Sequence, residues 1–195
     1  MAHLPCFPER LSVLDTALLV IDVQEKLVPK IHDASALVRN IAFLLDACRI
    51  LGVPVSATEQ YAKGLGGTVA ELASRLPAER PDKLAFSSCA VPDIVDGFRR
   101  NGRPKILIAG IETHVCVMQT VLDSLALGFR VFVAVDAVGS RYVVDHETAL
   151  LRMQQAGAIP VTSEMAAFEL TTVAGTPQFK EISRLVQERM KALSN

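Results

Sequence analysis

The sequence predicts an α/β protein in which a six-stranded, mostly parallel, Rossmann-like sheet lies between two layers of helices. Short apolar runs rich in β-branched residues, typical of strands buried on both faces, alternate with segments of helical apolar spacing. That alternation favours a parallel sheet with right-handed crossovers and helices on both faces. The 195 residues suffice for a sizeable core, and no linker, repeat or low-complexity tract divides them. We therefore expect residues 1–195 to form a single domain.

The first half of the chain supplies three of the six predicted strands. An irregular segment, about residues 1–14, precedes a buried strand at 16–21 that ends on Asp22. Gly52 marks the end of the first helix, because glycine readily adopts the left-handed conformation that follows a helix. The other elements predicted here are a helix at 35–51, a strand at 53–57, a glycine-rich loop at 59–67, a short helix at 69–76 and a short strand at 83–86. The loop lacks the glycine orders of nucleotide-phosphate sites, so we do not assign a phosphate to it.

The second half is organised around residues 105–127, where a buried strand runs into a helix. Ile106–Ala109 is a short apolar run, Gly110 ends it, and from Thr113 onward the apolar spacing becomes helical. Asp145 is a suitable N-cap for a helix over 146–155, which Gly157 terminates. The other elements predicted here are a helix at 94–101, strands at 130–135 and 158–162, and a C-terminal helix at about 177–193.

Composition argues against nucleic-acid, membrane and metal partners. The net charge is −1 and no basic block is present, so nucleic-acid binding has no electrostatic support. The apolar runs are far too short to span a bilayer, and residues 1–9 lack the pattern of a signal peptide. The four cysteines and four histidines are scattered without metal-ligand spacing. We expect a reduced, cytoplasmic protein that needs no metal or other cofactor.

Cys116 and Asp22 are the first candidates for a functional site. Cys116 falls in the first turn of a helix after a buried strand, where unpaired N–H groups and the helix dipole favour a thiolate. A free cysteine is otherwise usually a small buried hydrophobe. Asp22 is either a loop cap or a carboxylate held at a cleft with a raised pKa. If the first and fourth strands are neighbours where the strand order reverses, both residues converge where ligands of such sheets bind.

The other reactive side chains have weaker support. His114 stands two residues before Cys116, but residues i and i+2 of a helix do not face each other, so a position at the pocket rim is favoured over a direct pair. Lysines are usually exposed, and only its place at the head of a short strand makes Lys83 a candidate. Cys48 lies within the apolar face of a helix and is assigned to the core. Two cysteines have no evident partner: Cys6 and Cys89.

Three segments carry a more specific signal. They are Leu19-Val-Ile-Asp22-Val-Gln, Lys83 before Ala85-Phe-Ser87, and Ala109-Gly-Ile-Glu-Thr-His-Val-Cys116-Val. Together they resemble the isochorismatase-like cysteine hydrolases, which include nicotinamidases and N-carbamoylsarcosine amidases. Further segments resemble the isochorismatase-domain-containing subgroup: Thr58–Gly66, Val135–Arg141 and Pro177–Ile182. The similarity covers nearly the whole chain.

The resemblance implies a catalytic triad of Asp22, Lys83 and Cys116. It also implies a cis peptide bond between Ile111 and Glu112, and an oxyanion hole formed by the backbone N–H groups of Glu112 and Cys116. In this scheme Asp22 accepts the thiol proton and the thiolate attacks a carbonyl carbon. The N–H pair stabilises the oxyanion, and Lys83 keeps Asp22 ionised.

The segment after the second strand distinguishes this chain from nicotinamidases, which carry an Asp-x-His and a further histidine there to hold a metal. Thr58-Glu-Gln-Tyr61 stands at that place and no histidine is nearby, so we do not expect a bound metal or nicotinamidase activity. Glu59, Gln60 and Tyr61 are predicted to line the pocket and to favour a substrate with hydrogen-bond donors. Two further residues are assigned to the pocket: Gln24 and His114.

We therefore expect a hydrolase that acts on a small amide, carbamoyl or similar C–N substrate through an acyl-enzyme at Cys116. The alternative is a catalytically silent family member that serves as a binding or scaffold protein. A nucleotide-binding oxidoreductase is not supported, because no glycine fingerprint follows the first strand. The resemblance and the hydrophobic composition further predict a homo-oligomer, a dimer or larger.

Overall fold

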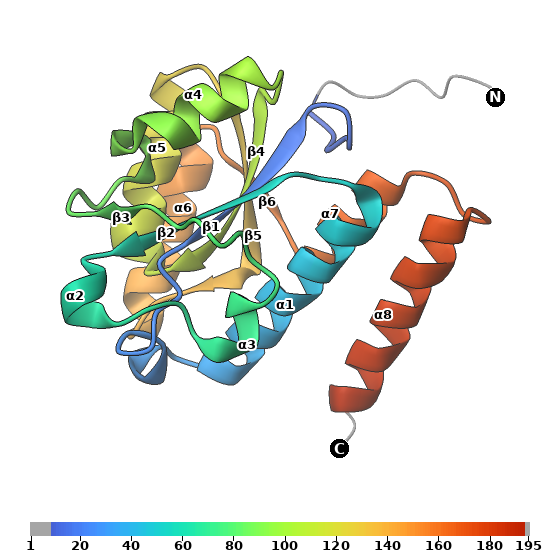
Figure 1. Cartoon of the computed structure of the whole chain (residues 1–195), viewed down its shortest axis with the longest axis horizontal. Helices are drawn as coiled ribbons and strands as arrows, with labels where there is room; N and C mark the ends of the chain where they lie inside the picture. The colour runs from blue at the N-terminus through green and yellow to red at the C-terminus, as the bar shows by residue number, and fades with distance from the viewer. Residues whose placement is uncertain (1–8, 194–195) are drawn as a thin grey trace.

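The computed structural model describes residues 9–193, which form a three-layer α/β/α arrangement (Figure 1). Of the segment predicted to be irregular, residues 1–8 lie outside the described part of the chain, and Cys6 lies there with them. Residues 9–14 form turns and no helix or strand. The predicted C-terminal helix is present as α8 (Pro177–Leu193).

Six strands form one sheet in the order β3-β2-β1-β4-β5-β6, and every neighbouring pair is parallel. The predicted fold class is therefore confirmed, and the first and fourth strands are neighbours as expected. They pair along their whole length, with Thr16 opposite Lys105 and Ile21 opposite Gly110. The strands are β1 (Thr16–Ile21), β2 (Val55–Gln60), β3 (Asp82–Lys83), β4 (Lys105–Ile111), β5 (Arg130–Gly139) and β6 (Ile159–Val161).

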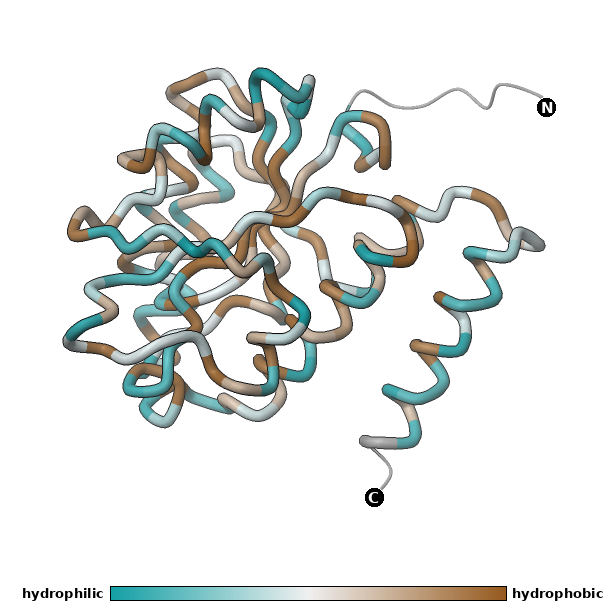
Figure 2. The backbone as a smooth tube through the Cα atoms, in the orientation of Figure 1, coloured by the Kyte–Doolittle hydropathy of each residue, from teal (hydrophilic) through white to brown (hydrophobic). Residues whose placement is uncertain are grey.

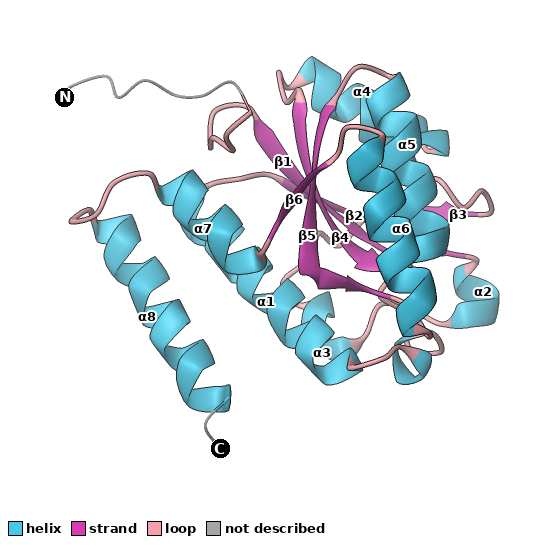
Figure 3. Cartoon of the chain, turned by 180° about the vertical axis from the view of Figure 1, so that it is seen from behind, coloured by secondary structure: helices cyan, strands magenta, loops and turns pink. Residues whose placement is uncertain are grey.

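Helices cover both faces of the sheet, as Figures 1 and 3 show. One face carries α4, α5 and α6, whereas α1 and α7 cover the other and α8 packs outside them. The remaining α-helices are α1 (Ala34–Leu51), α2 (Ala62–Leu65), α3 (Ala70–Ala73), α4 (Pro92–Arg100), α5 (Met118–Ala126), α6 (Val143–Gln155) and α7 (Ser163–Thr171). Two 3-10 turns, η1 (Val28–Lys30) and η2 (Ser88–Ala90), and a π-helical turn, η3 (Thr113–Val117), complete the elements.

Two apolar clusters, one on each face, hold the layers together. Alternate residues of β1 divide between them: Leu18 and Val20 join the cluster beneath α1, whereas Leu19 and Ile21 join the cluster beneath α5. The hydrophobic colouring accordingly concentrates in the central strands (Figure 2). Burial on both faces explains why this strand reads as an unbroken apolar run rather than as an alternating one.

The second and third strands differ from their predicted bounds. The strand predicted from residue 53 starts two residues later, because the Val53 N–H donates to the Cys48 carbonyl and closes the end of α1. The strand predicted over 83–86 is wrong beyond its first residue, since β3 ends at Lys83. The carbonyls of Ala85 and Phe86 turn back and accept hydrogen bonds from the Lys83 ammonium group instead of pairing with a neighbouring strand.

The fourth strand does not end at Gly110, as predicted, but continues to Ile111. Gly110 has φ 119°, and a Cβ at this position would overlap the backbone of Ile21 in β1. Glycine is therefore required where the two central strands approach each other. The helix expected from Thr113 is divided into the π-helical turn and α5, which begins at Met118.

Two helices also differ from the prediction. The helix expected at 146–155 starts earlier, at Val143 after the N-cap residue Tyr142, so Asp145 lies in its first turn and does not cap it. The second, α7, was not predicted, because its buried face consists of a serine, two alanines and a single leucine and gives a weak apolar pattern. The Thr162 side chain caps it by accepting a hydrogen bond from the Met165 N–H.

Candidate active site

Asp22 lies at the carboxyl edge of the sheet, directly after β1, and is fully buried. Each carboxylate oxygen has its own partner: Thr58 Oγ1 donates to Oδ1 at 2.8 Å, and Lys83 Nζ donates to Oδ2 at 2.7 Å. Thr58 is held there because it stands opposite Ile21 in the pairing of β1 with β2. The carboxylate is thus engaged in a buried ion pair and does not cap a loop.

Lys83 is 5 % exposed, so the general expectation of an exposed lysine does not hold here. Besides Asp22, its ammonium group donates to Gln60 Oε1 at 2.7 Å, to the Phe86 carbonyl at 2.8 Å and to the Ala85 carbonyl at 3.3 Å. An ammonium group has three N–H donors, and these acceptors use all of them. Burial is the largest influence on the pKa of Asp22 and raises it, while the charge and hydrogen bond of Lys83 oppose the increase.

Cys116 is the third predicted residue that the fold brings to this place. It lies in the π-helical turn η3 and is 6 % exposed. Its thiol is 3.9 Å from Gln60 Oε1 and also contacts the Asp22 carboxylate. Burial and the negative charge of Asp22 raise the pKa of Cys116 to about 12, and Lys83 offsets only part of that increase. These influences oppose the one expected from the helix start and favour the thiol form of Cys116.

Glu112 begins the turn that carries Cys116. The peptide bond between Ile111 and Glu112 is cis, as the resemblance implies. The Glu112 carboxylate accepts a hydrogen bond from Arg141 Nε at 3.0 Å, and its carbonyl accepts from the Val117 N–H at 3.2 Å. The two N–H groups predicted to form an oxyanion hole, those of Glu112 and Cys116, therefore belong to one short segment.

Two residues assigned to the pocket lie around the ion pair. Gln60 contacts Lys83 directly, and Gln24 binds the backbone of Gln60. Gln60 is buried and accepts from Lys83, as described above. Gln24 is fully buried, and its side-chain amide exchanges two hydrogen bonds with the backbone of Gln60. Both glutamines therefore belong to the surroundings of Lys83.

For the other residues assigned to the pocket, Glu59, Tyr61 and His114, the structure shows no side-chain contact with the ion pair. Glu59 accepts hydrogen bonds from both the backbone and the hydroxyl of Thr68, and so ties β2 to the glycine-rich loop. Tyr61 is 48 % exposed. His114 Nδ1 is 3.0 Å from Ser140 Oγ, so its ring contacts the end of β5. The structure does not pair His114 with Cys116.

Sequence reasoning missed the hydroxyl groups that link Asp22 to the Cys116 turn. Thr58 Oγ1 is 3.2 Å from Ser88 Oγ, and the Ser88 N–H donates to Thr120 Oγ1 at 2.9 Å. The Thr120 hydroxyl in turn donates to the Cys116 carbonyl at 2.7 Å. A signal existed for Thr58, which directly follows the second predicted strand and so stands beside Asp22 in a parallel sheet. Ser88 and Thr120 had none.

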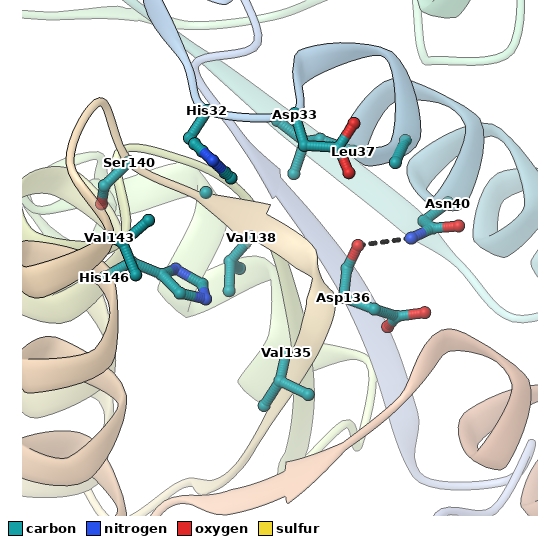
Figure 4. A pocket seen from close by; sticks show the side chains of 12 residues that line it. His32, Asp33, Leu37, Asn40, Val135, Asp136, Val138, Ser140, Val143 and His146 are labelled. Atoms are coloured by element: carbon teal, nitrogen blue, oxygen red, sulfur yellow. Dashed lines mark hydrogen bonds between the residues drawn. The ribbon is translucent and has the colours of Figure 1, made fainter.

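Two surface hollows lie near the carboxyl edge of the sheet. One, of about 240 Å³, has His32 and His146 on one side and Asn40 and Asp136 on the other (Figure 4). The three predicted catalytic residues do not line it. The other, of about 220 Å³, is lined by Leu27, Lys30, Glu112 and Arg141. Because it includes Glu112, it is the hollow that adjoins the predicted site.

Within residues 9–193, no group of three or more histidine, cysteine, aspartate or glutamate side chains is arranged to hold a metal ion. In the same part of the chain, no helix combines the length and the apolar character needed to cross a bilayer. Metal independence and a cytoplasmic location stay predictions.

The fold and this cluster define a class: a three-layer α/β/α protein that buries a carboxylate, an ammonium group and a thiol together at one edge of its sheet. The family model of the isochorismatase domain matches residues 16–165, a span that contains all three groups. The chain therefore belongs to the isochorismatase family, and this membership indicates a hydrolase.

Two relatives span most of the chain. The secreted isochorismatase effector Isc1 of Phytophthora sojae (strain P6497) is 38 % identical over 98 % of this chain and 95 % of its own length. Isochorismatase domain-containing protein 2A of Mus musculus is 42 % identical over 88 % of this chain and 82 % of its own. The resemblance to the isochorismatase-domain-containing subgroup is thereby confirmed.

Three solved structures share the fold. A structure named MAR1 ribonuclease, from Caenorhabditis elegans, has a TM-score of 0.85 and 40 % identity over 91 % of this chain and 92 % of its own. YcaC from Pseudomonas aeruginosa, described with hexane-2,5-diol and covalent acrylamide, has a TM-score of 0.82 and 27 % identity over 94 % and 98 %. The Escherichia coli YcaC gene product, described as an octameric hydrolase of unknown specificity, has a TM-score of 0.82 and 25 % identity over 97 % and 100 %.

Proposed function

We propose that this protein is a cysteine-dependent hydrolase that cleaves a small amide, carbamoyl or similar C–N substrate through an acyl-enzyme at Cys116. Family membership supplies the hydrolase, whereas the nucleophile and the type of bond are the proposal. One observation carries it. The Lys83–Asp22 ion pair, 2.7 Å long and buried, abuts a thiol that has no disulfide partner. A base, a cation and a nucleophile thus share one enclosed place.

In the proposed reaction Asp22 is the base for the Cys116 thiol. Burial raises the pKa of Asp22, which makes its carboxylate a stronger base than an exposed one. As the proton passes to Asp22, the sulfur bonds to the carbonyl carbon and an electron pair moves to the carbonyl oxygen. The N–H groups of Glu112 and Cys116 would donate to that oxyanion, and such donors contribute about 3–4 kcal/mol each.

The tetrahedral adduct then collapses and the C–N bond breaks. Asp22 returns its proton to the leaving nitrogen, which departs as ammonia or an amine and leaves the acyl group on sulfur. A water molecule next loses a proton to Asp22 as it attacks the thioester, and the sulfur leaves and recovers that proton. The Lys83 ammonium group favours the ionised form of Asp22 before each attack.

Two alternatives have less support. A silent scaffold gains little from a buried ion pair, because desolvation of both charges offsets much of their attraction. The name of the Caenorhabditis elegans structure raises RNA hydrolysis for this chain. Cleavage of a phosphodiester does not use a thiol that attacks a carbonyl carbon, and a net charge of −1 gives no general attraction for RNA.

The test is thiol labelling with iodoacetamide, a small amide electrophile, at neutral pH. A Cys6→Ser background removes the cysteine that lies outside the described residues. Peptide mapping by mass spectrometry should show Cys116 labelled before Cys48 and Cys89. Asp22→Asn removes the base for attack on a substrate, so kcat/KM should fall about a hundredfold or more. Cys116 should stay open to labelling, because the negative charge that raises its pKa is also removed. Cys89 serves as the internal control and should keep its rate.

Preferential labelling of Cys48 or Cys89, or full substrate turnover by a folded Asp22→Asn variant, would count against the assignment. A panel of amides and carbamoyl compounds, with an RNA oligonucleotide as one arm, then identifies the substrate class. Trapping of an acyl group on Cys116 and its loss in Cys116→Ser are the expected results. RNA cleavage that survives Cys116→Ser would replace the proposal.

A further inference from the structure

Gln60, which the sequence assigned to the pocket, contacts two of the three predicted catalytic residues. It is 8 % exposed, at the last position of β2. Its Oε1 accepts a hydrogen bond from Lys83 Nζ at 2.7 Å, and the Cys116 thiol is 3.9 Å from the same oxygen. One amide oxygen therefore lies against both the cation and the nucleophile of the proposed reaction.

Hydrogen-bond chemistry fixes the orientation of this amide. The other end of the group, Nε2, donates to the Leu84 carbonyl at 2.9 Å. A carbonyl only accepts and an ammonium group only donates, so the reverse orientation would lose both bonds. The oxygen must therefore face Lys83 and Cys116.

Resting on the proposed function, we propose that Gln60 is a positioning residue that holds the Lys83 ammonium group against the Asp22 carboxylate and beside the Cys116 thiol. Three acceptors lie closest to Nζ: Asp22 Oδ2, Gln60 Oε1 and the Phe86 carbonyl. Because they use its three donors in different directions, the ammonium group is fixed in place. Gln60 is neutral, so it binds the cation without adding negative charge beside the sulfur.

Gln24 supplies the support for this arrangement. Its Oε1 accepts from the Gln60 N–H at 2.7 Å and its Nε2 donates to the Gln60 carbonyl at 3.0 Å. The same Nε2 donates to the Gly66 carbonyl at 2.7 Å. Gln24 thus binds the backbone of Gln60 much as a neighbouring strand would, and it also joins the glycine-rich loop to the site.

The experiment measures the rate of Cys116 labelling by iodoacetamide as a function of pH, in the Cys6→Ser background. Gln60→Leu removes the acceptor beside the sulfur, so the third N–H of Lys83 turns to the Ala85 carbonyl and the ammonium group is no longer held at Cys116. We therefore expect a rate about tenfold lower at every pH. Gln187→Leu, at an exposed position of α8, is the matched control and should keep the parent rate.

Gln60→Glu gives a signature that a merely structural role would not produce. While protonated, the new carboxyl group can accept from Lys83 and donate to the Leu84 carbonyl as the amide does. Once ionised, it adds a negative charge beside the sulfur, in a site that already contains Asp22, Lys83 and, at longer range, Glu112. The labelling rate relative to the parent should therefore fall as pH rises, whereas for Gln60→Leu this ratio stays constant.

A residue that only lined the pocket would leave labelling unchanged and raise KM for a substrate with little effect on kcat. Parent-like labelling in both folded Gln60 variants would thus overturn the proposal. If Gln60→Leu fails to fold, as circular dichroism would show, the pH course of Gln60→Glu decides alone, and a flat ratio overturns the proposal. Failure of the parent protein to label Cys116 first would instead overturn the proposed function.

Discussion

At the scale of single residues, Lys83 sets the charge balance of the site. Lys83→Met keeps the length of the side chain and deletes its charge, so we expect kcat/KM to fall about a hundredfold or more. The lysine also opposes the increase in the pKa of Asp22. Without it, Asp22 stays protonated to a higher pH, so the acid limb of the kcat/KM profile should move to higher pH. Steady-state assays across pH measure both effects.

Lys180→Met, at an exposed position of α8, is the matched control for this variant and should keep full activity. Circular dichroism must show that Lys83→Met is folded, because it leaves the buried Asp22 charge unpaired. Full activity of a folded Lys83→Met variant would exclude Lys83 from the mechanism.

Single residues also show what sequence reasoning could reach. The family resemblance selected Asp22, Lys83 and Cys116, whereas general burial tendencies alone would place Lys83 in solvent. Its burial depends on Asp22, 61 positions away in sequence, and on carbonyls that turn back just after β3. Side-chain periodicity reports only neighbours along one element, so it could not indicate these contacts.

At the scale of elements, the close approach of β1 and β4 depends on Gly110. Gly110→Ala would place a Cβ against the backbone of Ile21 at φ 119°, which L-residues rarely adopt. We expect the free energy of unfolding to fall by about 3 kcal/mol, from backbone strain and overlap together. Chemical denaturation monitored by circular dichroism measures the loss.

Gly128→Ala separates the cost of backbone strain from the cost of steric overlap. Gly128 also has a positive φ, 86°, but a Cβ there would meet no atom within 4 Å. Only the conformational cost remains, and we expect a loss of about 1 kcal/mol. If both variants lost the same free energy of unfolding, overlap with the backbone of Ile21 would contribute nothing to the cost of Gly110→Ala.

Elements with a clear apolar pattern or a clear helix cap were predicted well. Elements whose formation depends on contacts with distant parts of the chain were not. The run at 16–21 and the helix ended by Gly52 follow directly from burial and capping. The alanine-rich face of α7 gives little periodic signal, and the π-helical turn η3 has no sequence signature of its own. The short β3 exists because its neighbour β2 holds it, which is a property of the sheet.

At the scale of the whole molecule, we predict a homo-oligomer. Large apolar side chains remain on the surface, among them Leu14, Leu84 and Val144, which are 82 %, 76 % and 67 % exposed. The Escherichia coli YcaC gene product, which shares this fold, is described as octameric. Light scattering during size exclusion should give a mass that is a multiple of 21.1 kDa. A stable monomer at micromolar concentration would contradict the prediction.

We also predict that activity needs no metal. The Asp22, Lys83 and Cys116 groups supply the base, the cation and the nucleophile, and no histidine stands in the segment directly after the second strand, between Gln60 and Lys83. Dialysis against EDTA should leave the rate unchanged, and added zinc or manganese should not raise it. Activity that is lost with the chelator and restored by metal would reveal a metal requirement.

The central position of β1 also bears on how the chain folds during synthesis. β1 is made first, yet one of its two edges pairs with β4, where Thr16 stands opposite Lys105. Until that later strand emerges from the ribosome, the nascent chain carries an open, apolar strand edge, the kind of surface that invites aggregation. Chaperone binding early in translation would protect it. The arrangement that brings Asp22 to Cys116 thus leaves one edge of β1 unpaired until the residues of β4 have been made.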